Sequence, residues 1–190
     1  MPATVLDDNT ALVLIDLQKG IAAGATVHPL DGVLANAAKL ADAFRARKLP
    51  VVLVRVHWSD DGGDLPTGRT TAPGPKAPLP EGFATFVDEL GDTTGDIVIT
   101  KRHWGAFHGT ELDVQLRRRG VTGIVLAGIA TSIGVESTAR AAYEHGYHVT
   151  IAHDATTDRD PQSHEHSVEK IFPRLGEVDS TEAILSLLKG

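Results

Sequence analysis

Short apolar runs, separated by stretches of helix length, set the pattern of this chain. Runs of this kind are typical of strands that are buried on both faces. We expect strands at 11–15, 51–56, 97–100, 123–128, 148–152 and, with a weaker pattern, 175–178. Helices are expected between them, several with apolar side chains at helical spacing, at 31–48, 83–90, 111–119, 134–145, 163–172 and 181–188.

Alternating strands and helices predict an α/β fold. The sheet should be parallel and doubly wound, with right-handed crossovers that place helices on both faces. No repeat, low-complexity tract or linker divides the chain, so residues 1–190 are interpreted as one domain. Residues 58–82 are rich in Gly and Pro and predict a long loop. A loop of this length is usually a lid, a binding loop or an oligomer contact.

The composition restricts the class of protein. The 190 residues are 42% hydrophobic and 23% charged, which is ordinary for a globular protein, and no run is apolar enough to span a membrane. A net charge of −7 without a basic block argues against a nucleic-acid partner. There is no Cys, which excludes disulfides, Cys-ligated metals and thiol catalysis. The first residues do not resemble a signal peptide, so we expect a cytoplasmic protein.

Three of the predicted strands end at residues or turns that could form a catalytic site. Asp16 ends the first, Lys101 ends the third, and a tight corner at 128–135 follows the fourth. Each alone has a plain explanation, since a carboxylate can cap a helix or be solvated and a Lys is usually exposed. Ligands of open parallel sheets bind at the carboxyl ends of the strands, where these groups would meet. Together they predict a catalytic site for a small molecule.

The motifs around these residues resemble those of the isochorismatase-like hydrolases, which include the cysteine hydrolases. The resemblance covers nearly the whole chain and is carried by the segments Leu14–Gln18, Lys101–Thr110, Gly128–Thr131 and Ser132–Arg140. It implies a sheet of six mostly parallel strands in the order 3-2-1-4-5-6 and a homodimer or larger homo-oligomer.

The resemblance also implies roles for individual residues. Asp16 would be catalytic and paired with Lys101. A non-prolyl cis peptide would join Ile129 to Ala130, and these two residues, with Gln18, would contact the substrate. Two effects oppose each other at Asp16, because a neighbouring Lys lowers the pKa of a carboxyl group and burial raises it.

Gly134 is the main departure from the family pattern, because it occupies the position of the nucleophilic Cys. Ser132 and Ser137 do not match that position, and Ser132 is expected to cap the following helix. True isochorismatases also lack the Cys, and several have Gly there. The resemblance therefore implies vinyl-ether hydrolysis, with Asp16 as general acid, Lys101 orienting it and Gly134 leaving room for the substrate. The rest of the corner looks more like the cysteine-hydrolase branch.

Two alternatives remain open. Asp16 could activate water for amide hydrolysis without a covalent step. The protein could instead be a non-catalytic ligand-binding or scaffold member that lost its nucleophile, although a dead site would not need a charged pair.

Other residues have both a functional and a structural interpretation. Trp58, Trp104 and Phe107 follow strand ends and could wall a substrate pocket, or they could pack in the core or a dimer contact. Nicotinamidases of the same superfamily bind zinc after the second strand, but here His57 lacks the matching Asp. We therefore expect no metal and no cofactor. Glu136 and Arg140 have the spacing of a surface ion pair.

Overall fold

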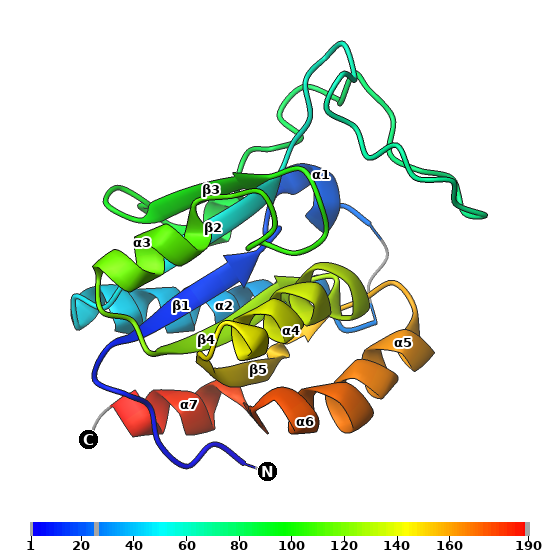
Figure 1. Cartoon of the computed structure of the whole chain (residues 1–190). Helices are drawn as coiled ribbons and strands as arrows, with labels where there is room; N and C mark the ends of the chain where they lie inside the picture. The colour runs from blue at the N-terminus through cyan, green and yellow to red at the C-terminus, as the bar shows by residue number, and fades with distance from the viewer. Residues whose placement is uncertain (1, 25–26, 189–190) are drawn as a thin grey trace.

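The computed structural model describes residues 2–24 and 27–188, which include every candidate site residue named above. A single six-stranded sheet forms the centre of the molecule (Figure 1). Its strand order is β3-β2-β1-β4-β5-β6, and every pairing is parallel, as the resemblance implied. The strands are β1 (Thr10–Ile15), β2 (Val51–Val56), β3 (Ile97–Lys101), β4 (Gly123–Ile129), β5 (His148–Thr157) and β6 (Glu177–Asp179).

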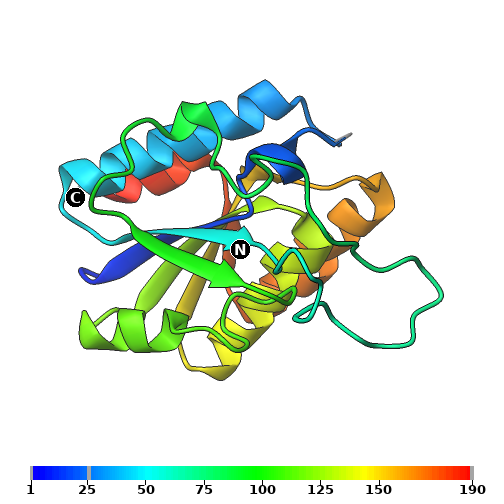
Figure 2. The same cartoon turned by 90° about the horizontal axis from the view of Figure 1, so that it is seen from above.

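Helices cover both faces of the sheet (Figure 2). The longer ones are α2 (Leu30–Ala46), α3 (Leu112–Arg118), α4 (Glu136–Glu144), α5 (Pro161–His166) and α7 (Thr181–Leu188). Shorter helical segments are α1 (Lys19–Ala22), η1 (Asp88–Leu90), η2 (Thr131–Val135), η3 (Ser167–Ile171) and α6 (Phe172–Leu175). Among these, η2 and η3 are single π-turns that lead into α4 and α6.

Two hydrophobic cores lie on opposite faces of the sheet because side chains alternate along each strand. On β1, Val13 and Ile15 belong to the core beneath α3, α4 and α6, whereas Leu12 and Leu14 belong to the core beneath α2 and α7. All six residues of β1 are buried. A central strand that is buried on both sides explains why its sequence is a continuous apolar run.

The segment between β2 and η1 departs most from expectation. Its first part extends away from the body as a long excursion (Figure 1). The helix expected at 83–90 is wrong, since only the 3₁₀ turn η1 forms at its end. The backbone of Phe83 and Thr85 accepts hydrogen bonds from the N–H groups of Gly20 and Lys19, at 3.0 and 2.8 Å. This tertiary pairing holds the segment, which forms turns at 81–84, alongside residues 18–20.

Smaller differences concern the C-terminal half. Strand β5 extends to Thr157, beyond the expected end, through an irregularity in its pairing with β4. The helix expected at 163–172 begins at Pro161, where the Asp160 carboxylate caps it through Ser163 N–H (2.7 Å). The sixth strand starts at Glu177, two residues later than expected, because α6 occupies the preceding residues.

Candidate active site

Asp16 and Lys101 meet at the carboxyl edge of the sheet, although 85 positions separate them in sequence. Asp16 follows β1, and Lys101 is the last residue of β3, with β2 between them. Lys101 Nζ lies 2.7 Å from Asp16 Oδ2, and the two side chains are only 2% and 8% exposed. Lys101 Nζ also donates to the carbonyl of His103 at 3.2 Å. The pair is therefore fixed and largely excluded from water.

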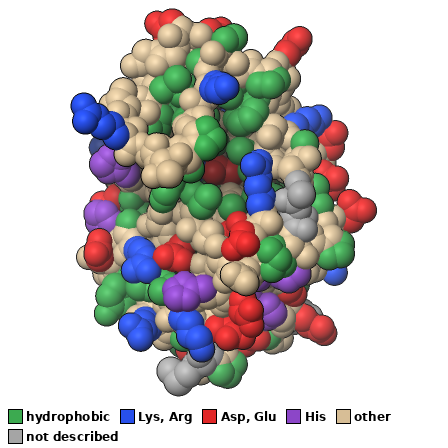
Figure 3. Space-filling model, turned by 90° about the vertical axis from the view of Figure 1, so that its right-hand side faces the viewer, with side chains coloured by type: hydrophobic (Ala, Val, Ile, Leu, Met, Phe, Trp, Pro, Cys, Tyr) green, Lys and Arg blue, Asp and Glu red, His purple; other side chains and the backbone are tan. Residues whose placement is uncertain are grey.

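A hollow opens on this edge of the sheet. Figure 3 views it and shows an acidic side chain at the bottom, surrounded by hydrophobic side chains. Small-molecule sites are typically concave and mostly apolar, with few polar groups that fix orientation. The hollow lies at the strand ends, where the sequence predicts the site.

Burial dominates the acidity of Asp16. It raises the pKa of this carboxyl group from 3.8 to about 6, although the charge of Lys101 and its hydrogen bond lower it. Oδ2 accepts from Lys101, whereas Oδ1 is buried and has no hydrogen-bond partner among the described residues. Asp16 also has a left-handed backbone (φ 51°), a conformation that Asp adopts more readily than most residues. The two oxygens of this carboxyl group are therefore not equivalent, because only Oδ2 is held by a hydrogen bond.

The corner after β4 places Gly134 next to the Asp16 carboxylate. The Ile129–Ala130 peptide bond is cis, at the position that the resemblance indicated. A Cβ on Gly134 would lie 3.4 Å from Asp16 Oδ2 and 2.9 Å from Ile15 Cγ2. The residue that would carry the nucleophile in a cysteine hydrolase therefore lies directly beside the acid, and here it presents no side chain.

Glycine is also required at Gly128. Its φ is 124°, and a Cβ there would lie only 2.1 Å from the carbonyl oxygen of Ile15. No other residue type fits so close a contact between β4 and β1. The close approach brings the corner to the end of β1, where Asp16 begins.

Two residues that support the corner were missed in the sequence. Asp158 accepts from the backbone N–H and the hydroxyl of Ser132 (2.7 and 2.8 Å), so Asp158 caps η2 and the expectation that Ser132 is the cap is wrong. His164 contacts Thr131 through a 2.8 Å hydrogen bond between Nδ1 and Oγ1. Burial lowers the pKa of His164. The position of Asp158 at the end of β5 is the signal that could have identified it.

Gln18 has a structural position. Its side chain is fully buried, its Oε1 accepts from Val56 N–H (2.8 Å), and its Nε2 donates to the carbonyls of Val56 (3.1 Å) and Phe83 (3.0 Å). Three backbone groups thus occupy the amide that the resemblance assigned to the substrate. Gln18 instead ties the end of β2 to the segment beyond it.

The three aromatic candidates are dispersed. Trp58 is 9% exposed and donates from Nε1 to the carbonyl of Arg102 (2.9 Å). Phe107 stacks on His145, with ring centroids 5.1 Å apart, beyond the C-terminal end of α4, so it packs in the core and does not wall the site. Trp104 is 65% exposed, three residues after Lys101. Of the two corner residues, Ile129 is buried and Ala130 is half-buried.

Neither a metal site nor a membrane span is found in the part of the chain that the structure describes. No three His, Cys, Asp or Glu residues there converge as metal ligands. No helix within the same residues combines the length and the apolar character that crossing a bilayer requires. Glu136 and Arg140 form the expected ion pair, with 2.9 Å between Oε1 and Nε.

Comparison with known proteins agrees with the fold. The chain belongs to the isochorismatase family, because the isochorismatase domain matches residues 10–183. It is 50% identical to the isochorismatase family protein YecD of Escherichia coli O157:H7, over 94% of this chain and 96% of that protein. It is 30% identical to the ureidoacrylate amidohydrolase RutB of Agrobacterium fabrum, over 97% and 93%.

Solved structures show the same relationship. An isochorismatase family protein from Burkholderia thailandensis superposes with a TM-score of 0.94 and 44% identity, covering 98% of each chain. The N-carbamoylsarcosine amidase of Thermoplasma acidophilum superposes with a TM-score of 0.72 and 26% identity, covering 92% of this chain and 97% of that one. Members of the family are hydrolases, and these relatives include amidohydrolases.

Proposed function

We propose that this protein hydrolyses the vinyl ether of a small anionic substrate by proton transfer from Asp16, without a covalent intermediate. The observation that carries the proposal is the buried Asp16 carboxyl group, which has a pKa of about 6, an unpartnered Oδ1, and Gly134 next to its Oδ2. A general acid works best when its pKa lies near the working pH, and an Asp with an ordinary pKa would be almost fully ionised there.

The chemistry follows from this arrangement. Protonated Asp16 gives its proton to the terminal vinyl carbon, which leaves an oxocarbenium ion at the ether carbon. Water adds to that carbon, and the resulting hemiketal breaks its bond to the ether oxygen while its hydroxyl proton passes to that oxygen. The products are an alcohol and, from an enolpyruvyl ether, a keto acid. The Asp16 carboxylate recovers a proton from the added water. Lys101 holds the carboxyl group in place and moderates its pKa, and Gly134 leaves space for the vinyl group.

Hydrolysis of a small amide by water is the second candidate. It is favoured by the similarity to a ureidoacrylate amidohydrolase and an N-carbamoylsarcosine amidase. In that reaction Asp16 would act as a base, so it would have to be ionised. The same residue would then require the opposite protonation state, which makes the two functions separable.

Pyruvate release from isochorismate tests the first proposal. We expect turnover by the natural chain and by Arg69→Gln, a change in the exposed loop, and loss of turnover in Asp16→Asn. Asn preserves the size of the side chain and tolerates the left-handed backbone. Release that does not exceed that of Asp16→Asn would reject isochorismate as the substrate. Ammonia release from small amides would then favour the second function, and silence in both assays would favour a non-catalytic protein.

A further inference from the structure

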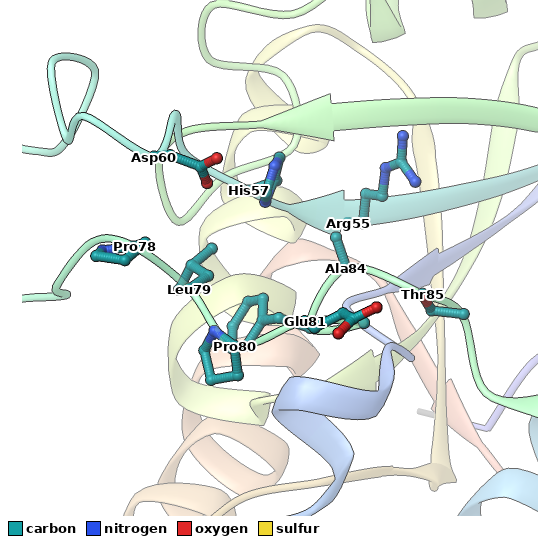
Figure 4. A pocket seen from close by; sticks show the side chains of 11 residues that line it. Arg55, His57, Asp60, Pro78, Leu79, Pro80, Glu81, Ala84 and Thr85 are labelled. Carbon is teal, nitrogen blue, oxygen red and sulfur yellow. The ribbon is translucent and has the colours of Figure 1, made fainter.

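A second polar cavity lies at the carboxyl end of β2, apart from the Asp16–Lys101 contact. It has a volume of about 650 Å³ and is bounded by the last residues of β2 and by residues 78–85. Arg55 and His57 contribute its basic groups, and Asp60 and Glu81 its acidic ones. Figure 4 shows Arg55 on β2 and His57 just beyond the end of this strand, with the 78–85 segment passing alongside.

Arg55 is a half-buried cation without an acidic partner. Its Nε donates to Thr100 Oγ1 (3.0 Å), and its guanidinium carbon lies 5.9 Å from the centre of the Phe86 ring. Among the described residues no carboxylate forms an ion pair with it, whereas Arg45 and Arg140 both have one. Guanidinium groups withdrawn from water are normally matched by an anion. The missing anion is therefore expected to come from a ligand.

His57 makes a second, independent contribution. Its Nδ1 is buried and has no hydrogen-bond partner within residues 2–24 and 27–188. Buried polar atoms are rarely left unsatisfied, so this atom also indicates an absent partner. In the tautomer with its proton on Nδ1, the ring can donate to an acceptor oxygen.

We infer that this pocket binds the carboxylate of a small organic acid, with Arg55 and His57 as the residues that recognise it. Arg can donate two parallel hydrogen bonds to a carboxylate. Asp60 and Glu81 line the same cavity, so a singly charged carboxylate is accepted more readily than a dianion such as phosphate. The pocket would select substrates that carry an acid group remote from the reacting bond.

Hydrogen bonds connect the walls of this pocket to the segments that carry Asp16 and Lys101. His57 N–H donates to the carbonyl of Lys101 (3.2 Å), and Gln18, two residues after Asp16, holds Phe83 of the opposite wall. A substrate whose acid end is held at Arg55 would thus be positioned from the strand next to Asp16. The inference deepens the proposed function and rests on it only for this catalytic consequence. Binding of a carboxylate can be tested without any turnover.

The test uses benzoate and its neutral amide, benzamide, on the whole protein. Imidazole resonances of isotopically labelled His residues are followed during titration, and His57→Gln identifies the signal of His57. We expect benzoate to shift that signal saturably, and benzamide to bind at least about tenfold more weakly. Inorganic phosphate should also bind more weakly than benzoate.

Variants of Arg55 then decide the assignment. Arg55→Gln should weaken benzoate binding at least about tenfold without affecting benzamide, and Arg55→Lys should preserve the preference for benzoate. Arg69→Gln, in the exposed loop, should change nothing. Equal binding of benzoate and benzamide, or unchanged benzoate binding in Arg55→Gln, would overturn the inference. Benzoate binding in a protein that does not hydrolyse isochorismate would reject isochorismate as the substrate but support this pocket.

Discussion

Asp16 and Asp64 are both paired with cations that are neighbours in sequence, yet their acidities change in opposite directions. Asp16 contacts Lys101, and Asp64 contacts Arg102. Burial raises the pKa of Asp16 to about 6, whereas hydrogen bonds from Ser59 and the contact with Arg102 hold that of Asp64 at about 2. The side chain of Asp64 is 33% exposed, against 8% for Asp16. A cationic neighbour alone therefore does not decide the protonation state, which depends on burial of the carboxyl group and on the hydrogen bonds that it accepts.

The largest expected difference between the two carboxylates is in turnover. We expect Asp16→Asn to lower kcat by about 100- to 10,000-fold, the usual contribution of a general acid or base, and Asp64→Asn to leave it nearly unchanged. Steady-state pyruvate release measures both. A comparable loss in the two variants would mean that the exposed pair contributes to the reaction or to the fold of the site.

The pH dependence of kcat/KM sharpens the comparison. An acid with a pKa of about 6 loses its proton above that pH, so kcat/KM should fall about tenfold per pH unit between pH 7 and 9. Ionisation of Asp64 is complete in this range and should leave no trace in the profile. A fall below pH 6 instead of above it would show that Asp16 acts as a base.

Stability should also respond differently to the two groups. The raised pKa of Asp16 means that the folded state holds its proton more tightly than the unfolded state. The contribution of this proton to the free energy of unfolding is complete below pH 3.8 and is lost as the pH rises through about 6. The resulting loss of stability is about 3 kcal/mol. Asp64 has the opposite sign, and its contribution is lost as the pH falls from 3.8 through about 2. Urea unfolding of the natural chain and of Asp16→Asn between pH 4 and 7 measures the contribution of Asp16. A difference in free energy of unfolding that stays constant with pH would contradict the prediction.

Replacing the cation of each pair should change the pH dependence of kcat/KM only for the Asp16–Lys101 pair. Lys101 lowers the pKa of Asp16, so Lys101→Met should raise that pKa and move the falling limb of kcat/KM to higher pH by about one unit. Arg102→Gln is the matched control and should not move the limb. A limb that stays at the same pH in Lys101→Met would exclude Asp16 as its origin.

The smallest effect concerns the space beside Asp16. Gly134→Ala places a carbon 2.9 Å from Ile15 Cγ2, so one of the two side chains must shift, at a cost of about 1 kcal/mol. Gly68→Ala, in the loop, meets nothing within 4 Å and is the control. Denaturant unfolding measures both variants. Equal stability of the two would show that the corner has more freedom than its contacts suggest.

Much of the fold could be predicted because it follows from local pattern. The continuous apolar run of β1 predicted a strand buried on both faces, and the places of Asp16 and Lys101 at strand ends predicted that they would meet. Phe107 and Gln18 show the limit of such reasoning. An aromatic ring or an amide has the same sequence signature whether it meets a ligand, His145 or the backbone of Val56. Only the tertiary contacts distinguish these cases.

The protonation state of Asp16 could not be predicted for a similar reason. The sequence identified both opposing influences, but their balance depends on how completely water is excluded from the carboxyl group. Asp158 was missed because β5 continues beyond its apolar core to Thr157, and the residues there carry no clear alternation. The prediction of a helix at 83–90 was wrong because the backbone of this segment forms hydrogen bonds with residues that lie more than 60 positions away in sequence.

Gln18 suggests how relatives of this protein could change specificity while keeping the same reaction. One amide fastens the strand that ends at Val56 to Phe83, a wall of the adjacent cavity, and neither Asp16 nor Lys101 takes part in those bonds. The wall can therefore be redesigned through residues 78–85 while this fastening keeps it in register with the sheet. Directed evolution of substrate preference would do best to vary that segment and leave Gln18 untouched.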